Sequence, residues 1–326
     1  MTFVTDYFRG DNIRPPEAVT VNIDSVIKDF SADSIWLGLS PTTARSYAGL
    51  ARKFLRAHPN HNWADFKHET VVAYLNRLMV TPALHKPSIR LPSSVDVNRK
   101  ALKCLFAWAV SRGWLDSNPA EKVRRIKHKD RPIVPPQPNV VRAILEAIKA
   151  YPGDPELRAR NLLLVLFAID TGARLSEMLN LDIQNVWDGT QPVFPVTLNG
   201  KGGRWRWTAM SGTVVDALRA YIEVRRPKPG QPALFLTETG ERVSTTAARN
   251  LLLRLCDAAS VKRMGWHQFR RFHASKLRAA HVNESDAQMV LGMTEATWKR
   301  YTWSEAAMSA VTAQLANAPT RMLANG

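Results

Sequence analysis

The sequence predicts a mainly α-helical protein with two helical domains and a short β-hairpin in the second. Apolar residues recur at intervals of three and four along most of the chain, which is the spacing of one helix face. A basic segment and four prolines separate two groups of such helices within residues 122–138, as an extended interdomain linker does. Alternating apolar and polar residues around Asn199-Gly200 predict the hairpin.

The helices of the first domain begin and end at recognisable residues. Residues 1–21 are mostly polar and predict a flexible arm. Ser40 is a suitable N-cap with Pro41 in the first turn, and Gly113 is a suitable C-cap. Three prolines within residues 80–94 predict a loop. The helices expected are 22–37, 41–56, 71–79 and 95–112.

The second domain is predicted to be mostly helical, with its β segment at about 192–210. The boundaries expected are a helical domain at 22–126, a basic, proline-rich linker at 127–138 and a mixed domain at 139–326. The alternative is that the linker is a solvated loop inside one domain. The helices expected are 139–151, 156–170, 174–180, 212–225, 244–259, 266–280, 284–291, 294–302 and a tail helix at about 304–316.

The charge of the chain indicates a polyanionic partner. Lys and Arg number 45 against 28 Asp and Glu, which gives a net charge of +17 and a pI near 10.3. Nucleic acid is the usual partner of such a surface, and an anionic membrane surface or a merely solvated basic surface are the alternatives. A hydrophobic fraction of 45% and a charged fraction of 22% are those of a soluble globular protein.

The sequence also excludes some classes of protein. It has no apolar run near the roughly 20 residues that span a bilayer, and its N-terminus has no secretory signal. Cys104 and Cys256 lie in separate helical patterns, so we expect two small core residues and a reducing cytoplasm. We predict no metal site and no cofactor.

The first candidate for chemistry is Arg174, which follows a Thr-Gly-Ala turn and begins a helix. A guanidinium beside a helix N-terminus can hold a phosphate, and Glu177 three residues later can orient it through a salt bridge. The alternative is a surface ion pair of little energetic value.

A second candidate pair is His267 and Arg270, which share one helix face at positions i and i+3. They can direct an imidazole and a guanidinium at one phosphate. The alternative is a solvated basic face, because Arg271 and other basic residues crowd the same helix. His273 is more often a packed histidine than a catalyst.

Lys201 and Tyr301 complete the set. Lys201 lies at the glycine-flanked tip of the hairpin, where a mobile ammonium can protonate a leaving oxygen; alone, it is a turn lysine. Tyr301 can be a covalent phosphoryl carrier or a core aromatic at a helix end. Each element is weak alone, but their joint order matches the needs of phosphodiester exchange.

These segments resemble the motifs of the tyrosine recombinase (phage integrase) family. The resemblance covers residues 133–305 and extends more weakly to the helix after Ser40 and to Asn118-Pro119. The matching segments are Thr171-Gly-Ala-Arg174-Leu-Ser-Glu177, Gly200-Lys201-Gly202, His267-Gln-Phe-Arg270 and Leu291-Gly292 followed by Tyr301.

The resemblance implies roles for these residues. Arg174 and Arg270 would clamp the scissile phosphate, Lys201 would be the general acid, and His267 would assist proton transfer. Tyr301 would be the nucleophile that forms a 3′-phosphotyrosine. Glu177 would stand behind them and steady the site.

The chain departs from the family pattern at Met293. The family usually has His or Trp there, and the spacing to Tyr301 is about one residue short. Methionine cannot donate a hydrogen bond, and Trp298 is a candidate to fill the packing role instead. Arg271 also stands where the family commonly has His.

Too few residues precede the first helices for the arm-binding domain of many integrases, which suggests a recombinase of short core sites.

The resemblance also implies the partners. We expect double-stranded DNA held by a clamp of two domains, a homo-tetramer on two DNA sites joined through the tail helix, and an accessory DNA-bending protein where the site requires one. The protein would act in the cytoplasm at the nucleoid of a bacterial or phage-infected cell, without contact to a membrane. The tail can instead pack on its own subunit. The expected DNA contacts are Arg45, Arg52, Lys53, Arg56, Arg124, Arg125, Lys127, Arg204 and Arg271.

Two other functions stay open. A type IB topoisomerase-like enzyme uses the same chemistry but rejoins the same strand. A non-catalytic DNA-binding protein on a recombinase scaffold is the second alternative, and Met293 is the observation in its favour.

Overall fold

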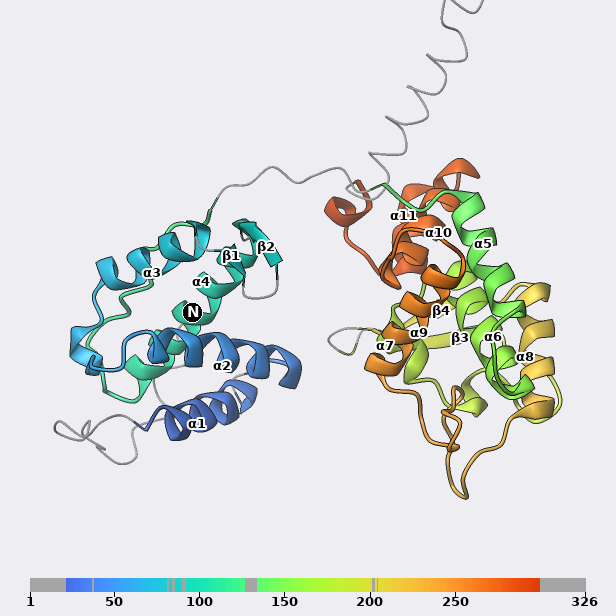
Figure 1. Cartoon of the computed structure of the whole chain (residues 1–326), viewed down its shortest axis with the longest axis horizontal. Coiled ribbons are helices and arrows are strands. Elements are labelled where there is room, and N and C mark those ends of the chain that lie inside the picture. The colour runs from blue at the N-terminus through green and yellow to red at the C-terminus, as the bar shows by residue number, and fades with distance from the viewer. Residues whose placement is uncertain are drawn as a thin grey trace, which may run out of the picture. The chain divides into compact units, whose positions relative to one another are not determined.

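The fold of the protein, taken from a computed structural model, is mostly helical, as predicted. The structure describes residues 22–36, 38–80, 82–83, 86–89, 92–126, 134–200, 203 and 205–299. The chain divides into two compact units, Met1–Asp130 and Arg131–Gly326 (Figure 1). Each unit has its own hydrophobic core. Among the described helices, none has the length and apolar character needed to cross a membrane.

The described residues of the first unit form four α-helices around an aromatic core. Ser40 caps α2, because its side chain accepts a hydrogen bond from the backbone N–H of Thr43. The ring of Phe54 lies at the centre of the core, 5.0 Å from Tyr74 and 5.7 Å from Phe106 in edge-to-face contacts. The helices are α1 (Ile23–Trp36), α2 (Pro41–Arg56), α3 (His68–Val80) and α4 (Pro92–Ser111), with a 3-10 turn, η1 (Trp63–Asp65).

The prediction of a loop at residues 80–94 was wrong in part. A small antiparallel ribbon of β1 (Pro82–Ala83) and β2 (Lys86–Ile89) lies there. Proline is tolerated at the first residue of a strand and on edge strands, because no ladder partner needs its missing N–H. Pro92 begins α4, where a missing N–H is also harmless. The three prolines therefore mark edges and a helix start within this segment.

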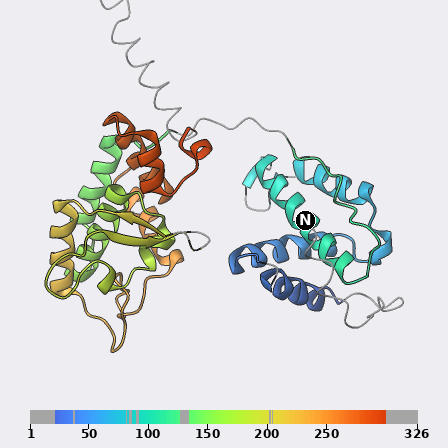
Figure 2. The same cartoon turned by 180° about the vertical axis from the view of Figure 1, so that it is seen from behind.

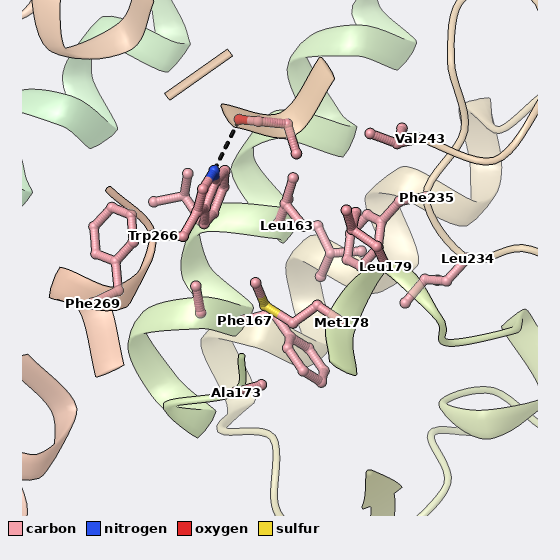
Figure 3. Close-up of a cluster of buried hydrophobic side chains, with 14 of the residues drawn as sticks. Leu163, Phe167, Ala173, Met178, Leu179, Leu234, Phe235, Val243, Trp266 and Phe269 are labelled. Atoms are coloured by element: carbon pink, nitrogen blue, oxygen red, sulfur yellow. Dashed lines mark hydrogen bonds between the residues drawn. The ribbon is translucent and has the colours of Figure 1, made fainter. Parts of the chain in front are cut away.

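The second unit surrounds α6 with helices and one hairpin. Leu163 and Phe167 of α6 are fully buried and contact a core that also includes Trp266, whose Nε1 donates to the carbonyl oxygen of Ala248 at 2.8 Å (Figure 3). The helices are α5 (Pro138–Lys149), α6 (Pro155–Thr171), α7 (Leu175–Leu179), α8 (Gly212–Val224), α9 (Thr245–Ala258), α10 (His267–Ala279) and α11 (Glu284–Leu291), with a 3-10 turn, η2 (Ile183–Asn185).

The predicted hairpin is confirmed as β3 (Val196–Asn199) paired with β4 (Trp205–Thr208), and it crosses the front of the second unit in Figure 2. Asn199 is opposite Trp205 in its register. In this hairpin β4 contacts α11, and β3 contacts α7, the helix that begins directly after Arg174.

A small third cluster closes the C-terminal end of the described chain. Trp298 is fully buried with Ala287 and Leu291, and Met293 packs against the same cluster. Trp298 is thus packed beside Met293, and its substitution for the His or Trp of the family stays a prediction. Both cysteines are free, Cys256 buried and Cys104 half-buried, as expected of small core residues.

Separate cores predict separate stabilities for the two units. Replacing the buried ring in Phe106→Ala should destabilise the first unit by about 3–5 kcal/mol, through lost apolar contact and the cavity left behind. Hydrogen exchange should then rise in α1 to α4 and stay unchanged in α5 to α11. Val97→Ala, on the more exposed face of α4, is the matched control and should change stability by less than about 0.5 kcal/mol. Loss of protection throughout both units would contradict separate cores.

Candidate active site

The centre of the candidate site is the buried carboxylate of Glu177 in α7. One oxygen accepts from Nη1 of Arg174 at 2.6 Å, and the other accepts from the Arg174 backbone N–H and from Nη2 of Arg206, both at 2.8 Å. The predicted salt bridge between Glu177 and Arg174 is therefore present, and it is one half of a network. Because the carboxylate is enclosed, it fixes both guanidiniums far more firmly than a surface ion pair could.

Arg206 is the member of this network that the sequence analysis missed. Alternation along β4 places Arg206 and Thr208 on the inner face of the hairpin. Nη1 of Arg206 also donates a hydrogen bond to the carbonyl oxygen of Val290. Its Nε is buried and has no hydrogen-bond partner. The alternating pattern of β4 was visible in the sequence, but the pattern alone does not say which face is buried.

The charges of the network hold the carboxylate in its ionised form. Burial by itself would raise the pKa of Glu177, but the charge of Arg206 and the hydrogen bonds from Arg174 lower that pKa overall. Burial likewise lowers the pKa of Arg206, and Glu177 opposes that shift. A guanidinium stays protonated at neutral pH in proteins, so we describe the pair as an ion pair.

Two glycines allow close contact around this network. Gly292 has φ of 56°, and a Cβ built on it would lie 2.9 Å from Cδ of Arg206. Gly172 has φ of 57°, and a Cβ there would lie 2.6 Å from a methyl carbon of Leu291. Any side chain at either position would meet both backbone strain and a steric clash. The glycines next to the Arg174 and Leu291 motifs are thus required by packing.

Arg270 joins the turn before α7 to the end of α11. Only 1% of the residue is exposed, and its guanidinium donates to the carbonyl oxygens of Gly172, at 2.8 Å, and of Leu291. His273, one turn further, places Nδ1 3.0 Å from the carbonyl oxygen of Ile169, which fits its interpretation as a packed histidine. Arg174 in turn donates from Nη2 to the carbonyl oxygen of Gly292 at 3.1 Å.

His267 is the first residue of α10 and lies at the surface among positive charges. Desolvation, followed by the charges of Arg271, Arg270 and Arg174, lowers its pKa to about 4. The imidazole is therefore neutral at pH 7 in the free protein.

An open pocket of about 710 Å³ lies beside the network. Arg174 and Arg206 line it, together with Gly200 at the end of β3, while Lys201 itself lies outside the described residues. Met293 also lines the pocket, and Tyr301 lies outside the described residues as well. The other lining residues are Trp205, Gln288, Met289, Gly292, Thr294 and Thr297.

The predicted DNA contacts of the first unit are partly engaged within the unit. Arg52 and Arg56 in α2 lie 3.0 and 3.6 Å from the carboxylate of Asp24 in α1. Arg45 and Lys53 are exposed on the same helix. Arg124 and Arg125 are exposed too, Arg271 donates to Gln268 at 3.2 Å, and Lys127 and Arg204 lie outside the described residues.

Within the ranges that the structure covers, no group of three or more His, Cys, Asp or Glu side chains could hold a metal ion. The donors that line the pocket are guanidinium, amide and hydroxyl groups, which suit an oxyanion.

The low pKa of His267 leads to a direct test. In the free protein the ring should titrate near pH 4 in NMR spectra, with its signals assigned by their loss in His267→Gln. Because the unfolded value is 6.5, the unfolded chain gains a proton before the folded chain does, so this group lowers stability as pH falls from about 6.5 to about 4. Arg271→Ala should raise the pKa. A ring that titrates near 6.5 would contradict this description of the site.

Known proteins show the same pattern of sequence and fold. The model of the phage integrase family matches residues 137–307. Tyrosine recombinase XerC of Mycobacterium sp. (strain KMS) is 33% identical over 211 residues, which cover 62% of this chain and 69% of that protein. XerC of Mycobacterium tuberculosis (strain ATCC 25177 / H37Ra) is 31% identical over 210 residues, with the same coverage of 62% and 69%.

Solved structures share the fold at lower identity. A lambda integrase tetramer bound to a Holliday junction aligns with a TM-score of 0.66 and 17% identity, over 87% of this chain and 78% of that chain. The XerH recombinase bound to a palindromic difH substrate aligns with a TM-score of 0.65 and 18% identity, over 88% and 81%. The family match and the XerC relatives identify this chain as a member of the phage integrase family, the tyrosine recombinases that cut and rejoin DNA.

Proposed function

We propose that this recombinase acts at a specific DNA site through a 3′-phosphotyrosine intermediate, with the side chains around Glu177 as its phosphate-binding centre. The observation that carries the proposal is the shared carboxylate: Glu177 holds Arg174 at the rim of a pocket that Gly200 also lines. Gly200 directly precedes Lys201, the proposed general acid, in the sequence.

The proposed chemistry is a pair of transesterifications. The phenol oxygen of Tyr301 attacks the phosphorus, the bond from phosphorus to the 5′ oxygen breaks, and Lys201 protonates that oxygen. Neutral His267 accepts the phenol proton, directly or through water, once the phosphate has raised its pKa. A 5′-hydroxyl from a second duplex then reverses these steps and releases Tyr301.

Arg174 and Arg270 would stabilise the charge of the pentavalent transition state. Arg174 is half-buried and borders the pocket, so its contact with a phosphate requires little movement. Arg270 is enclosed and donates to two carbonyl oxygens. A phosphate contact by Arg270 therefore requires the chain near Gly172 or Leu291 to shift when DNA binds.

Double-stranded DNA is the proposed substrate of both units. The basic face of α2 and the basic segment after α4 would contact the backbone, and α10 would add contacts through Arg271. Arg52 and Arg56 would exchange Asp24 for phosphates. Such contacts fix register but do not read sequence, so the DNA site itself is to be found by experiment.

Assembly and location are inferred from the family. We propose a homo-tetramer on two DNA sites, joined through the tail after Tyr301, and an accessory DNA-bending protein where the site requires one. The lambda integrase structure is a tetramer bound to a Holliday junction, which supports the proposal by analogy. The enzyme would act inside the cell, at the nucleoid.

The nucleophile is tested by covalent capture. Wild-type protein incubated with the DNA that flanks its own gene should form a protein–DNA adduct, and sequencing of the trapped ends should reveal the site. Tyr301→Phe should bind that site with near-normal affinity and form no adduct. Arg174→Lys should form the adduct on the order of 10²–10³ times more slowly, because a bidentate clamp is lost. An adduct with Tyr301→Phe would exclude this residue as the nucleophile.

The backbone contacts are tested by salt dependence. Affinity for the captured site should fall steeply as salt increases, because each phosphate contact releases a counterion. Lys53→Ala should weaken binding to all sequences and reduce the slope of log K against log salt by about 1. Lys228→Ala, an exposed lysine paired with Glu241 in the second unit, is the matched control and should leave the slope unchanged. An affinity independent of salt would rule out these contacts.

A further inference from the structure

Two tryptophans stand exposed on the outer face of β4. Trp205 is 67% exposed and Trp207 is 69% exposed, while the intervening Arg206 is buried. The other tryptophans whose side chains the structure describes are buried or half-buried. An exposed large aromatic ring is informative because burying it would stabilise the fold, so a ring left outside is available to a ligand.

The two rings differ in what lies beside them. Trp205 lines the pocket that Arg174 and Arg206 border, and Trp207 is not part of that lining. The strand repeat places the rings on one face, roughly 7 Å apart along the strand. The pocket therefore has one aromatic wall, next to the guanidinium that is proposed to hold a phosphate.

The lining indicates the chemical class of the ligand. The described residues that line the pocket include two arginines and no carboxylate, which favours an anion. A flat ring beside an anion-binding guanidinium suits a nucleotide, because a base can stack on the indole while its phosphate contacts the arginine. An apolar helix or a lipid tail would cover the ring, but it would offer no anionic group to the guanidinium of Arg174.

We propose that Trp205 is a stacking platform for one unpaired nucleobase next to the scissile phosphate. This inference rests on the proposed function. In an intact duplex the bases stack on one another, so the indole can hold only a base that has left its pair. Strand exchange requires such a step, because the strand with the free 5′-hydroxyl must separate from its complement before it joins a new duplex. Trp205 would stabilise the separated state.

The test uses the core site obtained by covalent capture, in the Tyr301→Phe background so that only binding is measured. One base within three positions of the cleaved phosphate is replaced by 2-aminopurine in a mismatch, one position at a time. A matched DNA carries an abasic site at the same position. Stacking quenches the fluorescence of 2-aminopurine, and the two DNAs give the contribution of the base to affinity.

At one of the scanned positions we expect the fluorescence of 2-aminopurine to be quenched when the protein binds. At that position the protein should bind the DNA with the unpaired base about tenfold more tightly than the DNA with the abasic site. Trp205→Ala should remove both effects, and Trp205→Phe should retain part of them. Trp207→Ala is the matched control, since it has the same residue type, strand face and exposure, and it should retain both. Thermal melting checks that each variant is folded, as expected for changes at exposed rings.

Three results would overturn the proposal. The protein could show no preference for an unpaired base at any position, it could keep that preference in Trp205→Ala, or it could lose it to the same extent in Trp207→Ala. The last result would assign the effect to the hairpin surface as a whole. Failure of the proposed function has a different signature, because the protein with Tyr301 intact would then form no covalent adduct. Normal adduct formation without any base preference would overturn the stacking proposal alone.

Discussion

The ion pair between Glu177 and Arg206 is the interaction on which the arrangement of the site depends. Breaking a buried pair by removing one partner typically costs about 3–5 kcal/mol, yet the intact pair contributes little net stability because both charges lose their hydration. Its effect here is geometric. Glu177 lies in α7, Arg206 in β4, and Arg206 donates to the carbonyl oxygen of Val290 in α11. The pair thereby links three separate segments, one of which, α7, begins directly after Arg174.

Backbone conformation is a second constraint of the same kind. Gly172 and Gly292 both have positive φ; Gly292 brings the backbone against the side chain of Arg206, and Gly172 brings it against the side chain of Leu291. Gly172 also supplies a carbonyl oxygen to Arg270, and Gly292 supplies one to Arg174. Backbone acceptors therefore orient both Arg174 and Arg270, and Glu177 adds a carboxylate contact to Arg174. Acceptors on rigid elements hold a side chain more accurately than another flexible side chain does, as a phosphate clamp requires.

Much of the fold follows from local patterns in the sequence. Capping residues and apolar spacing predicted the helices, and Ser40 and the Asn199-Gly200 hairpin were found as expected. The pairing of Arg174 with Glu177 was predictable because Glu177 follows three positions later in the first turn of the same helix. The pairing of Arg206 with Glu177 was not predictable, because the two residues are 29 positions apart and strand alternation does not reveal which face is buried. The pairing of Arg52 with Asp24 and the ribbon at Pro82 likewise depend on contacts between segments. The catalytic roles of Arg174, Lys201, His267, Arg270 and Tyr301 stay predictions from the sequence.

The inner and outer faces of β4 show how one short strand can serve both stability and chemistry. A hairpin with two tryptophans would ordinarily bury the aromatic face and expose the arginine, because apolar transfer favours that arrangement. The opposite orientation requires compensation for a buried guanidinium. Glu177 and the carbonyl oxygen of Val290 supply it. Because the strand period is two, burial of Arg206 places both Trp205 and Trp207 outside. The exposed aromatic surface beside the pocket is thus a geometric consequence of the ion pair, so a change that broke the pair would alter the arginine clamp and the aromatic wall together.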